Sequence, residues 1–114
     1  MIELKSKEEI NKIKKSCEIV RKVLNRLKEM IRPGLSTMDL DEEARKITKK
    51  FGAKPAFLNY RGYPGAVCIS VNEEVVHGIP SPKRILKDGD IVSIDFGVVY
   101  DGFFCATDTS VAAL

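Results

Sequence analysis

The dipeptide Asp101-Gly102 constrains the fold of this chain more than any other feature of its sequence. It separates two stretches rich in β-branched and aromatic residues, residues 91–100 and 103–111. An Asp-Gly pair between two such stretches is the strongest short-range signal for a β-hairpin, because both positions of the turn require a positive φ angle. A two-residue turn also fixes the register of the two strands, so Tyr100 is predicted to face Phe103.

Two amphipathic helices are predicted before the hairpin. Ser6 and Glu9 have the spacing of a capping box and predict a first helix over residues 7–31, which a Pro-Gly pair then ends. Its apolar residues recur every three or four positions, at Ile10, Ile13, Cys17, Val20, Leu24, Leu27 and Ile31. A second cap at Ser36 predicts another helix over residues 38–51, which a glycine follows.

Glycine, proline and β-branched residues replace lysine and glutamate in the second half of the chain. This half predicts a strand over residues 66–71, a short extended segment over residues 75–77 and a loop before the hairpin. Helices followed by antiparallel strands are typical of the α+β class, here with two helices packed on an antiparallel sheet. The length of 114 residues fits a single domain, residues 1–114.

Composition and charge exclude several classes of function. The net charge of +3, from 19 basic and 16 acidic residues, comes without a basic stripe of interleaved aromatics, so no nucleic-acid partner is expected. There is no apolar run long enough for a membrane span, and the first residues lack the apolar core of a signal peptide. The cysteine count of three is odd and there is no CxxC pair, so a disulfide is not expected and the cytoplasm is the expected location.

The hairpin brings two carboxylates together. In the predicted register Asp95 lies directly opposite Asp108, in a non-hydrogen-bonded pair with Cβ atoms about 4.5–5.5 Å apart. Carboxylates at this distance repel each other unless a shared proton, a base or a metal ion offsets the repulsion. Two solvated aspartates on an exposed sheet face remain the alternative to a metal role.

The residues around the two aspartates favour a hydrophilic site. Their face of the hairpin carries small residues, namely Ser93, Gly97, Ala106 and Ser110, while the other face is apolar and is expected to pack on the helices. Carboxylate oxygens suit Mn, Fe(II), Co or Zn, and paired carboxylates can bridge two metal ions that activate a water.

Four segments resemble those of type I methionine aminopeptidases, in the same order and spacing. They are KPAF at residues 54–57, NYRGYP at residues 59–64, CISVNEEVVHGIP at residues 68–80 and GDIVSID at residues 89–95. The resemblance implies one half of a pita-bread fold, in which two pseudo-symmetric halves share a dinuclear metal site. It implies five protein ligands, two aspartates from the N-terminal half and a histidine and two glutamates from the C-terminal half.

The resemblance also assigns roles to individual residues of this chain. Asp95 matches the first metal-binding aspartate, and His77 matches a catalytic histidine that contacts the scissile amide of the substrate. The positions that line the pocket for the methionine side chain are matched by Phe57, Tyr60, Tyr63 and Cys68. From the residues alone, His77 is as compatible with a turn or buried position, the tyrosines with packing, and Cys68 with an inert thiol.

Two departures from the family pattern affect these assignments. The second aspartate of the family is expected at Ala106, whereas this chain has Asp108, which keeps the same face but lies roughly 6.5–7 Å further along the strand. The chain also has about half the family length, so the histidine and both glutamates of the second half are missing. The chain alone is therefore expected to be inactive or very weakly active.

Three hypotheses for function follow. The chain is half of a metal-dependent aminopeptidase that acts on the N-terminus of nascent polypeptides and requires a C-terminal half as partner. Alternatively, a second copy of the chain completes the fold as a homodimer, with the apolar residues 111–114 in its interface. The third possibility is a metal-free module that keeps the methionine pocket and binds peptides without hydrolysis.

Overall fold

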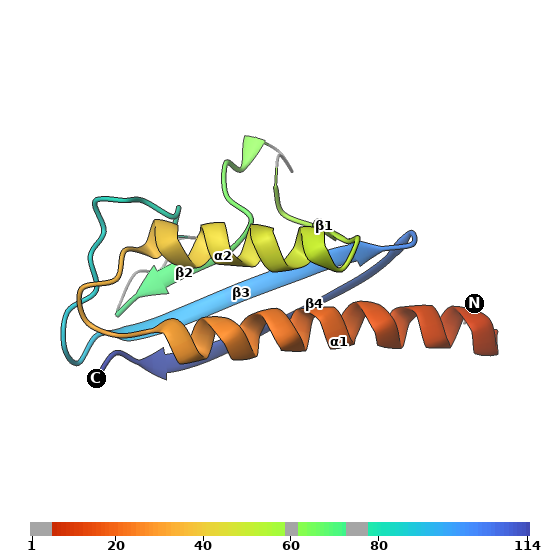
Figure 1. Cartoon of the computed structure of the whole chain (residues 1–114), viewed down its shortest axis with the longest axis horizontal. Coiled ribbons are helices and arrows are strands. Elements are labelled where there is room, and N and C mark those ends of the chain that lie inside the picture. Colours follow the sequence, from red (N-terminus) through yellow and green to blue (C-terminus); the bar gives the residue numbers. More distant parts are fainter. Residues whose placement is uncertain (1–5, 59–61, 73–77) are drawn as a thin grey trace.

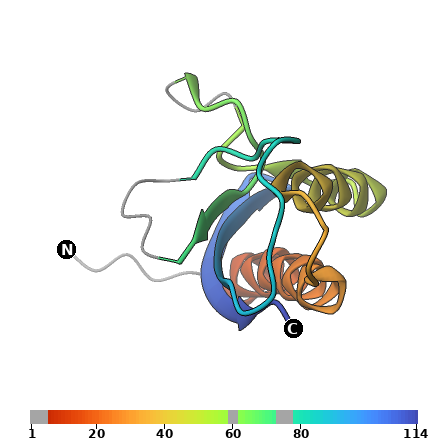
Figure 2. The same ribbon diagram turned by 90° about the vertical axis from the view of Figure 1, so that its left-hand side faces the viewer.

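A computed structural model of the chain describes residues 6–58, 62–72 and 78–114. Its elements are α1 (Lys7–Met30), α2 (Thr37–Lys50), β1 (Lys54–Pro55), β2 (Cys68–Val71), β3 (Ile91–Tyr100) and β4 (Phe103–Ala112). The strands form one antiparallel sheet, and both helices lie against the same face of it (Figures 1 and 2). The predicted α+β architecture is confirmed.

Capping residues fix the starts of both helices. The Ser6 hydroxyl accepts a hydrogen bond from the Glu9 amide at 3.1 Å, and the Glu9 carboxylate accepts one from the Ser6 amide at 3.3 Å. Ser36 and Asp39 form the same capping box at the start of α2. Each helix matches its prediction within one residue at either end. Neither helix, nor any other in the described part of the chain, is long and apolar enough to cross a membrane.

The long strand β3 is the centre of the sheet, with β1 and β2 along one edge and β4 along the other. Tyr100 pairs with Phe103 as predicted, and Asp101 and Gly102 have φ angles of 51° and 83°, which both positions of a type I′ turn require. The predicted strand over residues 66–71 is shorter in the structure and begins at Cys68. The predicted extended segment over residues 75–77 lies outside the described residues.

Strict alternation along β3 separates a core face from an open face. Val92, Ile94, Phe96 and Val98 are all 0% exposed and pack against the helices, whereas Ser93 and Asp95 between them are half-buried on the opposite face. The core receives the apolar stripe of α1, including Val20, Val23 and Leu27. The helices therefore cover one face of the sheet, and no helix of the described residues covers the other.

A disulfide joins Cys17 of α1 to Cys105 of β4, so the expectation of no disulfide was wrong. Cys17 lies on the apolar stripe of α1 and Cys105 on the core-facing side of β4, and the packing of the helix on the strand brings these two faces together. The Cα atoms are 5.3 Å apart, and the nearby Ser16 hydroxyl donates a hydrogen bond to the Phe103 carbonyl at 2.9 Å. Cys68 is buried and has a free thiol.

Candidate active site

Three ionisable side chains, one thiol and two carboxylates, form a row across the open face of the sheet. Cys68 of β2 pairs with Asp95 of β3, and Asp95 pairs with Asp108 of β4. Directly paired residues of antiparallel strands project to the same side, so the thiol and the two carboxylates share one face. The predicted opposition of Asp95 and Asp108 is confirmed. Asp95 is half-buried and Asp108 is exposed to solvent.

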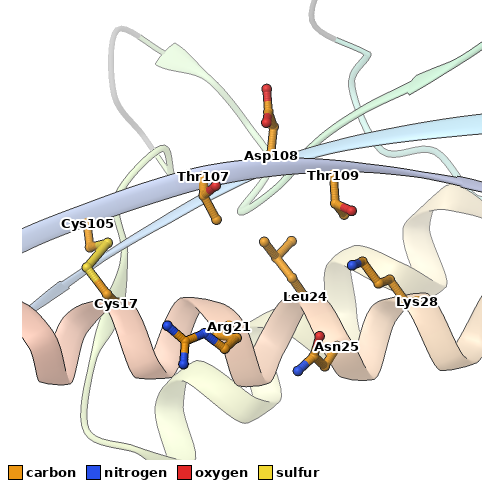
Figure 3. A pocket seen from close by; sticks show the side chains of 9 residues that line it. All are labelled: Cys17, Arg21, Leu24, Asn25, Lys28, Cys105, Thr107, Asp108 and Thr109. Atoms are coloured by element: carbon orange, nitrogen blue, oxygen red, sulfur yellow. A yellow bond between two sulfur atoms is a disulfide. The ribbon is translucent and has the colours of Figure 1, made fainter.

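The side chain of Asp108 points away from a cavity on the other side of β4. A cavity of about 380 Å³ opens between α1 and β4 and is lined on the α1 side by Arg21, Asn25 and Lys28. Figure 3 shows Thr107 and Thr109 pointing from β4 toward α1, while the side chain of Asp108 points away from the helix. Asp108 therefore belongs to the open face of the sheet, together with Asp95.

A second row of small polar side chains lies beside the first. Ser70 pairs with Ser93, and Ser93 pairs with Ser110. The hydroxyl oxygens of Ser93 and Ser110 are 3.0 Å apart. Ser93 and Ser110 therefore lie on the same face as Asp95 and Asp108, as the sequence predicted. Residues 6–58, 62–72 and 78–114 contain no group of three or more His, Cys, Asp or Glu side chains arranged to hold a metal ion.

The buried Cys68 pairs with Asp95 across the sheet and forms a hydrogen-bonded pair with the half-buried Tyr63. Burial raises the pKa of the Cys68 thiol, and the carboxylates of Asp95 and Asp41 raise it further, although a hydrogen bond with Tyr63 opposes them. Burial also raises the pKa of Tyr63 far above the usual value for a phenol. The Tyr63 hydroxyl lies 2.9 Å from the Val67 carbonyl and 3.0 Å from the Gly78 carbonyl. At neutral pH the pair therefore presents a neutral, weakly polar surface beside the carboxylate.

Of the other candidate site residues from the sequence, the structure describes only Phe57. Phe57 is half-buried and follows Ala56, whose amide donates a hydrogen bond to the Gly97 carbonyl of β3 at 2.9 Å. This bond fixes the chain next to β3 near Asp95, but it does not place the ring of Phe57 against Tyr63 or Cys68. Tyr60 and His77 lie outside the described residues.

One buried ionic group near the site was missed in the sequence. The carboxylate of Asp41 in α2 is completely buried and bonds to Arg45, to the Ala66 amide and to the Val67 amide. The spacing of Asp41 and Arg45 on one helix face is a signal for an ion pair, but such pairs are usually on the surface.

The chain matches the model of metallopeptidase family M24 over residues 11–113. It belongs to this family. The match spans most of α1 and all the other described elements, and it confirms the resemblance recorded from the four sequence segments. The prediction of half a pita-bread fold is also confirmed, because solved methionine aminopeptidase structures superpose on nearly the whole chain, which covers less than half of them.

Among sequence relatives, a methionine aminopeptidase of Aquifex aeolicus is 50% identical over 119 residues, covering 99% of this chain and 45% of the relative. One from Borreliella burgdorferi is 54% identical over 103 residues, covering 90% of this chain and 41% of the relative. The crystal structure of methionine aminopeptidase from Rickettsia prowazekii gives a TM-score of 0.93 at 32% identity, covering 99% of this chain and 45% of that one. Prolidase from Pyrococcus furiosus gives 0.81 at 28% identity, covering 96% and 31%. This M24 chain spans less than half the length of these relatives.

Proposed function

We propose that this chain is the N-terminal half of a methionine aminopeptidase, which removes the first methionine from nascent polypeptides in the cytoplasm. The observation that carries the proposal is the opposed pair Asp95 and Asp108 on the open sheet face of an M24 chain. The methionine aminopeptidases of other organisms that match the chain support the choice of substrate. In this proposal residues 1–114 form a single domain that carries part of the active site.

Asp95 and Asp108 are the metal ligands that this chain contributes. Two divalent metal ions, Mn, Fe, Co or Zn, would activate a water and polarise the substrate carbonyl when bound. Opposed carboxylates are suitable oxygen ligands for such ions, and a bound cation would offset their repulsion. The remaining ligands, a histidine and two glutamates by the resemblance, would come from a C-terminal half.

The register supports Asp108 rather than residue 106 as the second ligand. Ala106 pairs with Gly97, two positions nearer the turn, whereas Asp108 pairs with Asp95 itself. A carboxylate at 108 is therefore the nearest group that β4 offers to Asp95 on this face. The change from the family pattern is therefore compatible with metal binding.

The neutral pair Tyr63 and Cys68 would form one wall of the pocket for the methionine side chain, together with Phe57 and Tyr60. A thioether is apolar and polarizable, and it suits a surface of aromatic carbon and protonated sulfur. His77 would hydrogen-bond the scissile amide as charge develops on it. The adjacent Gly78 is anchored to β2, since its carbonyl accepts a hydrogen bond from the Ile69 amide at 3.0 Å.

Metal binding tests the ligand assignment. Replacing Asp95 by Asn is expected to weaken Mn²⁺ binding roughly 10- to 100-fold, because the amide supplies no charge and one oxygen only. Isothermal titration calorimetry of the wild-type chain, D95N and D108N gives the measurement. Asp88→Asn is the matched control, since it removes the same charge from an exposed loop. Wild-type affinity in D95N would refute Asp95 as a ligand.

Peptide hydrolysis tests whether the chain needs a C-terminal half for activity. The chain alone is expected to hydrolyse the peptide Met-Ala-Ser very weakly or not at all with Mn²⁺ present, because it lacks the histidine and the two glutamates expected from the C-terminal half. Adding the part of the Aquifex aeolicus enzyme that this chain does not match is expected to produce methionine release, measured by mass spectrometry. Full activity of the unmixed chain would show instead that the chain completes its own site.

A second copy of the chain is the alternative partner. Among the described residues no strand pairs with the outer edge of β4, and Phe104 on this strand is 55% exposed. An open edge of this kind can pair with a strand of another chain. A homodimer would then act as a scaffold or as a metal-free peptide-binding module, and sedimentation would detect it as a doubled mass.

A further inference from the structure

The Asp41 side chain is fully buried in α2, which is uncommon for a carboxylate. One of its oxygens accepts hydrogen bonds from the Ala66 amide at 2.7 Å and the Val67 amide at 2.9 Å. The other accepts one from Arg45 Nε at 2.7 Å. Such charge-assisted bonds are about twice as strong as bonds between neutral groups. The carboxylate thus binds the main chain of a segment distant in sequence, at residues 66 and 67.

Arg45 adds a further hydrogen bond to the same segment. Its guanidinium also donates a hydrogen bond to the Pro64 carbonyl at 2.9 Å, so one ion pair holds the chain at residues 64, 66 and 67. The side chain of Asp41 is 1% exposed and that of Arg45 is 41% exposed. Water therefore competes with the arginine bonds, but it does not reach the carboxylate.

The segment bound by Asp41 and Arg45, residues 63–68, carries two of the candidate pocket residues. Tyr63 precedes the first anchored carbonyl, and Cys68 follows the last anchored amide and pairs with Asp95. A Cβ added to Gly65 would lie 2.9 Å from Pro80 Cδ and 3.0 Å from a ring carbon of Tyr63. Gly65, in the middle of the segment, is therefore packed closely against Pro80 and Tyr63.

We propose that Asp41 is a positioning residue for the candidate active site. Its hydrogen bonds, together with those of Arg45, hold residues 63–68 against α2 and so keep Tyr63 and Cys68 beside Asp95. The contacts themselves do not depend on the function of the chain. The identity of the ligand in the pocket, methionine, rests on the proposed function.

Three variants separate this role from general stability. Asp41→Asn keeps the size of the side chain, but its amide group cannot accept from both backbone amides and from Arg45 together. Arg45→Met is a milder change, which releases the Pro64 carbonyl and leaves the two backbone bonds of Asp41. Glu42→Gln is the matched control, because it removes a negative charge from an exposed position of the same helix.

The first readout is the alkylation rate of Cys68 by iodoacetamide, since Cys68 is the one free thiol when Cys17 and Cys105 are joined. D41N is expected to react roughly 10- to 100-fold faster than wild type, and R45M by a smaller factor, because local opening becomes easier. The second readout is the binding of L-methionine, followed by NMR and expected to weaken roughly tenfold or more in D41N. Both are measured well below the melting temperature, so that global unfolding contributes to neither.

The outcomes distinguish failure of this proposal from failure of the proposed function. Wild-type alkylation rates in both D41N and R45M would overturn the positioning role, as would unchanged methionine binding in variants that react faster. Faster alkylation in a chain whose wild type does not bind L-methionine would support the positioning role and contradict the methionine pocket. A change in E42Q as large as that in D41N would attribute the effect to charge alone and overturn the proposal.

Discussion

Removing the Cys17–Cys105 disulfide is expected to lower the free energy of unfolding by about 4–5 kcal/mol. The two cysteines are 88 positions apart, so the bond closes a loop that includes most of the chain. A crosslink over such a loop restricts the unfolded chain far more than the folded one. The loss is a large fraction of the roughly 5–15 kcal/mol that stabilises an ordinary domain. Urea denaturation of wild type and of the double variant C17S/C105S, followed by circular dichroism, gives the measurement.

The reductant supplies the control for this experiment. Addition of tris(2-carboxyethyl)phosphine should lower the stability of wild type to that of the double variant and leave the double variant unchanged. Titration with Ellman's reagent under denaturing conditions should find one free thiol per wild-type chain, that of Cys68. Three free thiols, together with equal unfolding free energies, would show that the bond does not form in the protein.

The disulfide was missed because it depends on how a helix packs on a strand. The apolar pattern placed Cys17 on the buried stripe of the first helix, and alternation placed Cys105 on the core face of the hairpin. Both assignments are correct, since both residues pack at the interface of α1 and β4. Nothing in the periodicity gives the offset between helix and strand, and the odd number of cysteines argued against any pairing.

The elements that were predicted well are those with local causes. The capping boxes at Ser6 and Ser36 set the helix starts, and the turn at Asp101 and Gly102 set the pairing of Asp95 with Asp108. Each of these depends on residues close together in sequence, so no knowledge of the tertiary fold was needed.

The rest of the candidate site depends on long-range pairing. Cys68 meets Asp95 only because β2 pairs with β3 across a long connection, whose length does not specify a register. Asp41 lies in α2, and its buried role depends on the Ala66 and Val67 amides, 25 and 26 positions away. The sequence therefore predicted the two carboxylates, and it did not predict what holds the thiol next to them.

Replacing Phe96 by Ala is expected to lower the free energy of unfolding by about 3–5 kcal/mol, the usual effect of removing a large core side chain. Phe96 is 0% exposed and is among the largest fully buried side chains of the described chain. Phe104→Ala is the matched control, because this phenylalanine lies on the partner strand of the same hairpin and is 55% exposed. Its loss is expected to change stability by less than about 1 kcal/mol. Urea denaturation of the disulfide-bonded proteins compares the two.

The comparison also tests the register on which the candidate site depends. A slip of β4 by one residue would turn Phe104 toward the core and move Asp108 to the helix side, because successive side chains of a strand face opposite ways. Phe104→Ala would then destabilise the protein by about as much as Phe96→Ala, and Asp95 would lose its opposed carboxylate. A large effect at Phe96 with a small one at Phe104 supports the observed pairing, in which both aspartates share the open face of the sheet.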